Sequence, residues 1–205
     1  NSTTQGYLPL DDQAPAWLRD IARFFAIRSQ FVLTGNVDDY VLMPASNMAV
    51  PISLKDAVGA LLEVCCYDFL LCYDPFDHFQ LHAPTADKIG KLKTSSIGLN
   101  LDTNGHLEGS SRKLIETMRK LAALHSPRGA LLIEYPTQFG DEGQKELFGA
   151  SLKLSHMAPQ LPMLDGKARF NPIFWVTKNV DDLPAWFVLH NERIRVQTVK
   201  KPEIG

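Results

Sequence analysis

The sequence predicts an α/β fold, a three-layer αβα sandwich built around a mainly parallel sheet of five strands. Five short apolar runs carry this prediction, at residues 31–33, 68–74, 130–135, 172–177 and 194–199. Consecutive apolar positions are typical of strands that are buried on both faces. Amphipathic segments separate the runs, and helical crossovers of this kind make consecutive strands parallel.

Apolar residues recur at helical spacing in each crossover. We expect helices over residues 14–30, 54–67, 111–125 and 141–157, with a short helical turn around 184–189. Side chains that can accept hydrogen bonds from the amides of a first helical turn precede them, namely Asp11 or Asp12, Ser53, Ser110 or Ser111, and Asp141. The remaining segments are less regular: Pro44 and Pro51 bracket a predicted loop, 75–108 forms either short edge strands or a loop, and 158–170 forms a loop.

The composition indicates a globular chain with one domain over residues 1–205, whose first twelve residues form a polar N-terminal segment. The 205 residues are 45% hydrophobic and 21% charged, which is too apolar for a disordered chain. The net charge of −2 gives no basic field, so nucleic-acid binding is not indicated. The apolar runs are far shorter than the roughly 18 residues of a membrane-spanning helix, and we expect no membrane association.

Three cysteines, Cys65, Cys66 and Cys72, lie within eight positions in segments that are predicted to be buried. An odd number of thiols favours a reducing compartment over a disulfide framework, and we expect a cytoplasmic protein. The first residues contain neither a basic segment nor an apolar one, so no secretory signal is indicated. The sequence also lacks an initiator Met, and we expect it to be part of a larger protein.

Polar residues follow the predicted strands where each strand ends. The first four ends are Thr34-Gly35-Asn36, Asp74-Pro75, Glu134-Tyr135 and Thr177-Lys178-Asn179. In a doubly wound sheet, ligands bind at the carboxyl ends of the strands. These residues are therefore candidates for a binding site, although polar residues also follow strands that bind nothing.

The last part of the chain resembles the segment of AAA+ ATPases that runs from sensor 1 to the fifth strand. The run TKNVDDLP matches without gaps from Thr177 to Pro184, and a short helix, an arginine-containing segment and a strand that ends near Pro202 follow it. The pairing of LTGNVDDY at 33–40 with LIEY at 132–135 is similar to the front region of some bacterial AAA proteins. The resemblance covers residues 15–202 and implies the strand order 5-1-4-3-2.

The phosphate-binding loop of this family is not recognisable. Phosphate binding needs the pattern G-x-x-x-x-G-K-[ST] after the first strand. The chain has two Gly-Lys pairs, Gly90-Lys91 and Gly166-Lys167, and neither precedes Ser or Thr or follows the first strand. The loop that does follow it carries Asp38 and Asp39, whose carboxylates repel an anion.

Two further catalytic positions of the family differ in this sequence. Where the resemblance implies Asp-Glu for magnesium and water activation, the third strand ends in Glu134 and Tyr135. A phenol with a pKa of about 10 is a poor base at neutral pH. Lys178 occupies the place of the sensor asparagine. We therefore expect no catalytic residue and no cofactor in this fragment, with ATP and magnesium confined to the larger protein.

Two arginines fit a different role. The resemblance matches Arg193 to an arginine that reaches a neighbouring subunit's nucleotide site, and Arg195 lies two residues later. The simpler interpretation is that they are solvated arginines at the start of a strand. The resemblance implies other AAA+ subunits or domains as partners, a homo-oligomer and a helical lid beyond residue 205.

Two further groups of residues are weaker candidates for a functional site. Asp74, Asp77, His78 and His82 lack the spacing of a tight metal site, and we expect no metal. We expect the aromatic residues Trp186 and Phe187 to pack the short helix onto either the sheet or a partner.

Three hypotheses remain. The first is a regulatory, assembly or partner-docking domain that does not hydrolyse nucleotide. The second is an active NTPase in which Glu134 holds magnesium and Lys91 or Lys178 reaches phosphate. The third is an interaction domain of another doubly wound family, which a different strand order favours.

Overall fold

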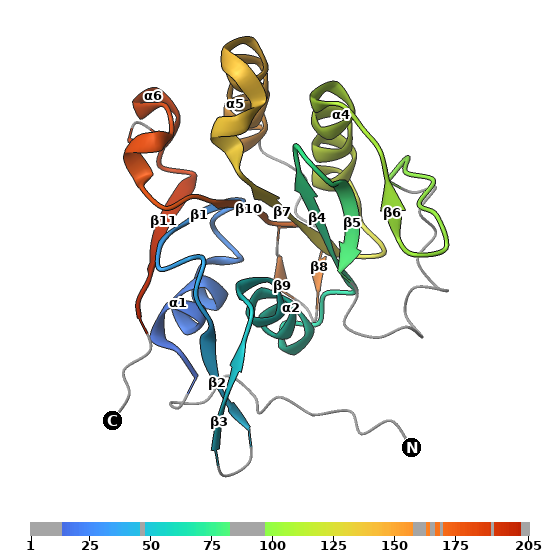
Figure 1. Cartoon of the computed structure of the whole chain (residues 1–205). Helices are drawn as coiled ribbons and strands as arrows, with labels where there is room; N and C mark the ends of the chain where they lie inside the picture. Colours follow the sequence, from blue (N-terminus) through green and yellow to red (C-terminus); the bar gives the residue numbers. More distant parts are fainter. Residues whose placement is uncertain are drawn as a thin grey trace.

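A seven-stranded sheet forms the centre of the computed structural model, which describes residues 14–45, 48–82, 97–157, 163–164, 167–168, 170–189 and 191–201. The strand order is β11-β1-β10-β7-β4-β5-β6 (Figure 1). The strands are β1 (Gln30–Gly35), β4 (Phe69–Asp74), β5 (His78–His82), β6 (His106–Leu107), β7 (Gly129–Glu134), β10 (Ile173–Val176) and β11 (Ile194–Val199).

The five predicted strands are β1, β4, β7, β10 and β11, and all of their pairings are parallel. Their order across the sheet is 5-1-4-3-2 in chain numbering, as the resemblance implies. The prediction of five strands is incomplete, because β5 and β6 extend the sheet by antiparallel pairing. Phe79 and Leu81 lie in β5, whereas the buried Ile97 and Leu99 lie outside the strands.

Helices cover both faces of the sheet, which makes three layers (Figure 1). On one face lie α1 (Ala16–Phe24) and α2 (Leu54–Val64), and on the other α4 (Ser111–Ala122), α5 (Gly140–His156) and α6 (Ala185–Val188). Each interface has its own buried apolar cluster. Phe31 and Phe174 stack in the first, and Trp175 packs against Phe148 and Phe187 in the second.

Two of the predicted helix caps are present. Ser53 accepts a hydrogen bond from the Asp56 amide at 3.1 Å, and Ser110 accepts one from the Lys113 amide at 3.5 Å. The prediction for Asp141 is wrong: it lies in the first turn of α5, because the chain enters that helix through the 3-10 turn η2 (Pro136–Phe139). Pro15 precedes α1 without a side-chain cap, and Asp11 and Asp12 lie outside the described residues.

The predicted loop between Pro44 and Pro51 is instead a hairpin of β2 (Val41–Ala45) and β3 (Met48–Ile52). Proline is tolerated in a two-stranded ribbon because both strands are edge strands and the missing amide can face away from the partner. A second pair, β8 (Met163–Leu164) and β9 (Lys167–Ala168), lies within the other predicted loop.

Replacing Cys66 by glycine is expected to stabilise the fold by about 0.5–1 kcal/mol. Cys66 follows the last turn of α2 with φ 61°, a left-handed conformation that favours glycine. The Cys66 and Tyr67 amides donate to the Glu63 and Leu62 carbonyls, so this conformation is part of the helix ending. Thermal unfolding of Cys66→Gly checks this. Glu63→Gly, inside the helix, is the control and should destabilise by about 1 kcal/mol.

Candidate functional site

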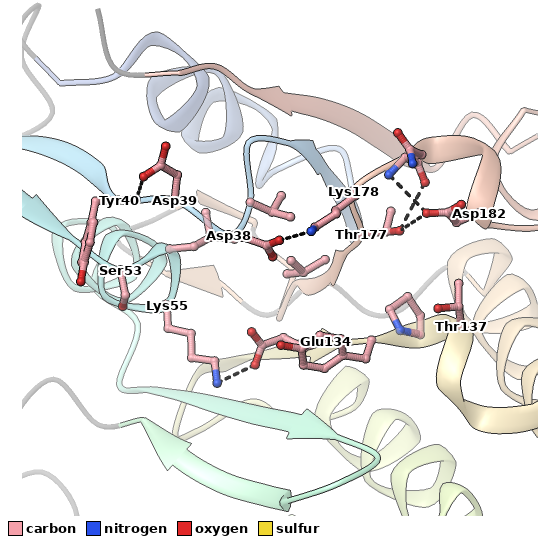
Figure 2. A pocket seen from close by; sticks show the side chains of 16 residues that line it. Asp38, Asp39, Tyr40, Ser53, Lys55, Glu134, Thr137, Thr177, Lys178 and Asp182 are labelled. Carbon is pink, nitrogen blue, oxygen red and sulfur yellow. Dashed lines mark hydrogen bonds and ion pairs between the residues drawn. The ribbon is translucent and has the colours of Figure 1, made fainter. Parts of the chain in front are cut away.

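A pocket of about 930 Å³ opens at the carboxyl edge of the parallel sheet (Figure 2). The segments around it are the loop after β1, the start of α2, the end of β7 and the residues that follow β10. Its lining residues are Val37, Asp38, Asp39, Tyr40, Ser53, Leu54, Lys55, Glu134, Tyr135, Pro136, Thr137, Val176, Thr177, Lys178, Asn179 and Asp182. Two of the strand ends singled out in the sequence, Glu134-Tyr135 and Thr177-Lys178-Asn179, meet here with the loop after β1, because parallel strands end at the same edge. Asp74 and Pro75, at the end of β4, do not line the pocket.

Backbone amides of the loop after β1 donate hydrogen bonds to carbonyls within the protein. The Gly35 amide donates to the Lys178 carbonyl and the Asn36 amide to the Val199 carbonyl, both at 3.0 Å. The Val37 amide donates to the Gly35 carbonyl at 2.9 Å. These bonds tie the loop to the ends of β10 and β11 and leave these three amides engaged.

Gly35 is required for this close approach. Its φ of 94° is left-handed, and a Cβ there would lie 3.0 Å from the Val199 carbonyl oxygen. Neither Gly35 nor Asn36 lines the pocket. The structure thus gives both residues a role in joining β1 to the neighbouring strand ends.

On one side of the pocket, Lys178 forms an ion pair with Asp38, with Nζ and Oδ2 2.5 Å apart (Figure 2). Both side chains are more than half exposed. The hydrogen bond and the charge of Asp38 raise the pKa of Lys178. The next residue, Asp39, accepts hydrogen bonds from the Asn36 side chain and the Tyr40 amide and is exposed.

A second ion pair joins Lys55 to Glu134 at 2.5 Å, separate from the first (Figure 2). It is less exposed, at 30% for Lys55 and 20% for Glu134. Burial disfavours the ammonium ion, but the hydrogen bond and charge of Glu134 outweigh that effect and raise the pKa of Lys55. Asp74 also acts on Lys55 and raises its pKa, so this lysine lies close to two carboxylates.

Sequence reasoning missed Lys55. It lies in the first turn of α2, the helix that follows β1 after the β2–β3 hairpin. The search for a glycine-rich signature does not find it, because a hairpin stands where such a loop would be short. The available signal is its place two residues after the capping Ser53 at the start of the helix that follows the first strand.

Thr177 is tied into the turn that follows β10. Its hydroxyl donates to the Asp182 carboxylate at 3.2 Å and contacts the Asn179 carbonyl at 3.3 Å. Asn179 and Asp182 form a capping box around η3 (Val180–Asp182). This part of the pocket is therefore a preorganised turn that presents a carboxylate and an amide.

Tyr135 has an unfavourable backbone conformation at the pocket rim. Its φ of 50° and ψ of 48° are left-handed, and the next residue is Pro136. Left-handed conformations cost a bulky residue energy, and the helical region is further disfavoured before proline. Its ring is 53% exposed and meets the 66% exposed ring of Phe76 edge-on, with centroids 5.7 Å apart.

The two arginines that the resemblance relates to a neighbouring subunit's nucleotide site lie at the start of β11. Arg193 is exposed just before β11, and Arg195 lies within that strand with its guanidinium 3.7 Å from the centroid of the Phe24 ring. Neither lines the pocket. Of the other candidate lysines, Lys91 lies outside the described residues, and Lys167 lies in β9.

The acidic and histidine residues that follow β4 have structural partners. Asp74 accepts hydrogen bonds from the Phe76 and Asp77 amides, and His82 lies 2.9 Å from Asp56. Within the described ranges no cluster of three or more His, Cys, Asp or Glu is arranged to hold a metal. Burial raises the pKa of Cys72 to about 12, so its thiol is a poor nucleophile.

One comparison with known proteins decides the family. Residues 7–200 match the family described as AAA+ chaperone, N-terminal Rossmann-like domain. The chain belongs to this family. A comparison with curated proteins finds no match.

Membership of an AAA+ chaperone N-terminal domain family, with the strand order 5-1-4-3-2, makes the chain a domain of a larger AAA+ protein. The hypothesis of another doubly wound family is therefore wrong. Among the described residues of this AAA+ domain, no helix is long and apolar enough to cross a membrane.

Proposed function

We propose that this AAA+ domain does not hydrolyse nucleotide and serves instead in the regulation, assembly or partner docking of its AAA+ chaperone. The observation that carries the proposal is the loop after β1. Its amides at Gly35, Asn36 and Val37 already donate within the protein, and its side chains Asp38 and Asp39 are acidic. A phosphate cradle requires the reverse, free amides and no nearby anion.

The cations of the pocket are also engaged. Lys55 and Lys178 each hold a carboxylate at 2.5 Å, so a triphosphate would have to displace both partners. The lining residues include four carboxylates and only these two ammonium groups. An excess of negative charge in a partly enclosed pocket disfavours a polyanion.

The water-activating position lacks a base. Tyr135 follows Glu134, and its strained backbone aims a half-exposed phenol at the rim where the family pattern has a carboxylate. This supports a fragment without catalytic residues and without a bound cofactor. We further propose that the protein is cytoplasmic, with other AAA+ subunits or domains as its partners. The odd number of cysteines in the sequence is in keeping with a reducing compartment.

Isothermal titration of Mg-ATP and Mg-ADP into the chain tests this proposal. We expect no binding heat up to millimolar nucleotide, for both the native chain and Lys55→Met. Lys145→Met, an exposed substitution on α5, is the matched control for the lost charge. Micromolar binding that Lys55→Met abolishes and Lys145→Met retains would contradict the proposal.

A second candidate function is an active NTPase, and the position of Lys55 is the observation that favours it. A lysine in the first turn of the helix after the first strand is where a phosphate-binding lysine is needed. Lys55, rather than Lys91 or Lys178, would then reach phosphate, and Glu134 would hold magnesium. Steady phosphate release that both Lys55→Met and Glu134→Gln abolish supports this candidate, and no turnover at high protein concentration excludes it.

A further inference from the structure

The residues that line the pocket include four carboxylates and two lysines, so their net charge is negative. Of the four lining carboxylates, Glu134 and Asp38 have lysine partners. Asp39 and Asp182 accept hydrogen bonds only from neutral donors among the contacts of the described residues. Because Asp39 is exposed, its carboxylate is accessible to a cation from solvent.

Exposed aromatic rings border the same pocket. Tyr40 and Tyr135 line it and are 63% and 53% exposed. Phe76, 66% exposed, extends this border through its edge contact with Tyr135. Large aromatic rings left in solvent next to a cavity are characteristic of binding surfaces rather than of ordinary surface positions.

We propose that this pocket docks an arginine-bearing peptide segment of a partner protein. The inference rests on the proposed docking function and names the chemistry of the partner. The pocket presents carboxylates and exposed aromatic rings, and an arginine guanidinium binds both. It pairs with carboxylates, and its plane stacks on aromatic rings. Asp39 and Asp38 receive the charge, and the rings of Tyr40, Tyr135 and Phe76 cover the guanidinium and its apolar stem.

The geometry favours arginine over other cations and over anions. A metal ion has no suitable ligand cluster among the described residues. The volume of about 930 Å³ exceeds what a single ion needs and accommodates side chains of an extended peptide. The negative balance of the lining residues attracts a basic segment and steers its approach, an effect that salt weakens.

Fluorescence anisotropy with a labelled arginine–glycine repeat peptide tests this inference. A citrulline–glycine peptide of equal length is the matched probe, because citrulline keeps the shape of arginine and lacks its charge. We expect micromolar binding of the arginine peptide at low salt, and binding at least about tenfold weaker for the citrulline peptide. Asp38→Asn with Asp39→Asn should weaken arginine-peptide binding about tenfold, and Phe76→Ala should weaken it several-fold.

Matched variants separate the pocket from the general charge of the chain. Asp141→Asn with Glu142→Gln removes two exposed carboxylates on α5, and Trp186→Ala removes an exposed ring on α6. Both should leave binding within about twofold. Equal binding of the citrulline peptide, equal loss in the control variants, or no binding at all would overturn the inference. Mg-ATP that displaces the peptide would instead contradict the proposed function and leave the pocket as the peptide site.

Discussion

Replacing Asn171 by alanine is expected to lower the free energy of unfolding by about 3–5 kcal/mol. Asn171 is 6% exposed and lies just before β10. Its carbonyl oxygen accepts from the Arg128 side chain at 3.1 Å and the Gly129 amide at 3.3 Å. Its amide group donates to the carbonyls of Leu121 and Leu124 at 2.9 and 2.7 Å.

Alanine would remove the partner that Asn171 supplies to these four groups, and each buried group left unpaired costs about 1–3 kcal/mol. The Leu121 carbonyl keeps the Leu124 amide as a donor at 3.1 Å. The loss is partly offset by water and local relaxation. Urea unfolding measures the change. Asn104→Ala, at an exposed turn position, is the control and should stay within about 0.5 kcal/mol. Equal effects of the two substitutions would show that the Asn171 network does not hold β7, β10 and α4 together.

Breaking the Lys55–Glu134 pair from the lysine side is expected to cost more than breaking it from the glutamate side. Lys55→Met should destabilise by about 2 kcal/mol and Glu134→Gln by about 1 kcal/mol or less. The reason is the surrounding charge: Asp74 also acts on Lys55, so removal of the lysine takes away a cation on which two carboxylates act. Both values allow for the partial solvent exposure of the pair.

A double-mutant cycle measures this coupling. The combination of Lys55→Met with Glu134→Gln should recover about 1 kcal/mol relative to the sum of the single changes. The exposed pair of Lys113 and Glu116, 3.3 Å apart on α4, is the control, and its coupling should be about 0.5 kcal/mol or less. A coupling for Lys55 and Glu134 as small as that of the control would contradict the description of this pair as less exposed and more strongly coupled than a surface ion pair.

The parallel sheet is predictable because its strands are apolar at consecutive positions, as in β7, where Ala130 to Ile133 are all fully buried. The hairpin is not, since Pro44 and Pro51 signal a break in most contexts and are tolerated here only in an isolated ribbon. The prediction that Asp141 caps α5 is wrong for a related reason: the turn η2 precedes the helix, and no local sequence pattern around Asp141 indicates that turn.

For the site, the strand ends are predictable because topology alone brings Asp38, Glu134 and Lys178 to one edge. The pairing of Lys178 with Asp38 is not, because it depends on the path of the loop after β1. Lys55 is not found by the sequence pattern, because the β2–β3 hairpin separates β1 from the helix α2 in which Lys55 lies. The strained conformation of Tyr135 is likewise a property of the fold and not of its local sequence.

Amide chemical shifts of the chain, titrated in parallel with Mg-ATP and with the arginine–glycine peptide, test the central claim most directly. The account predicts shifts at Asp38 to Tyr40 and at Glu134 to Thr137 with the peptide, and none at these residues with nucleotide. Shifts at the same residues with Mg-ATP, and none with the peptide, would contradict it.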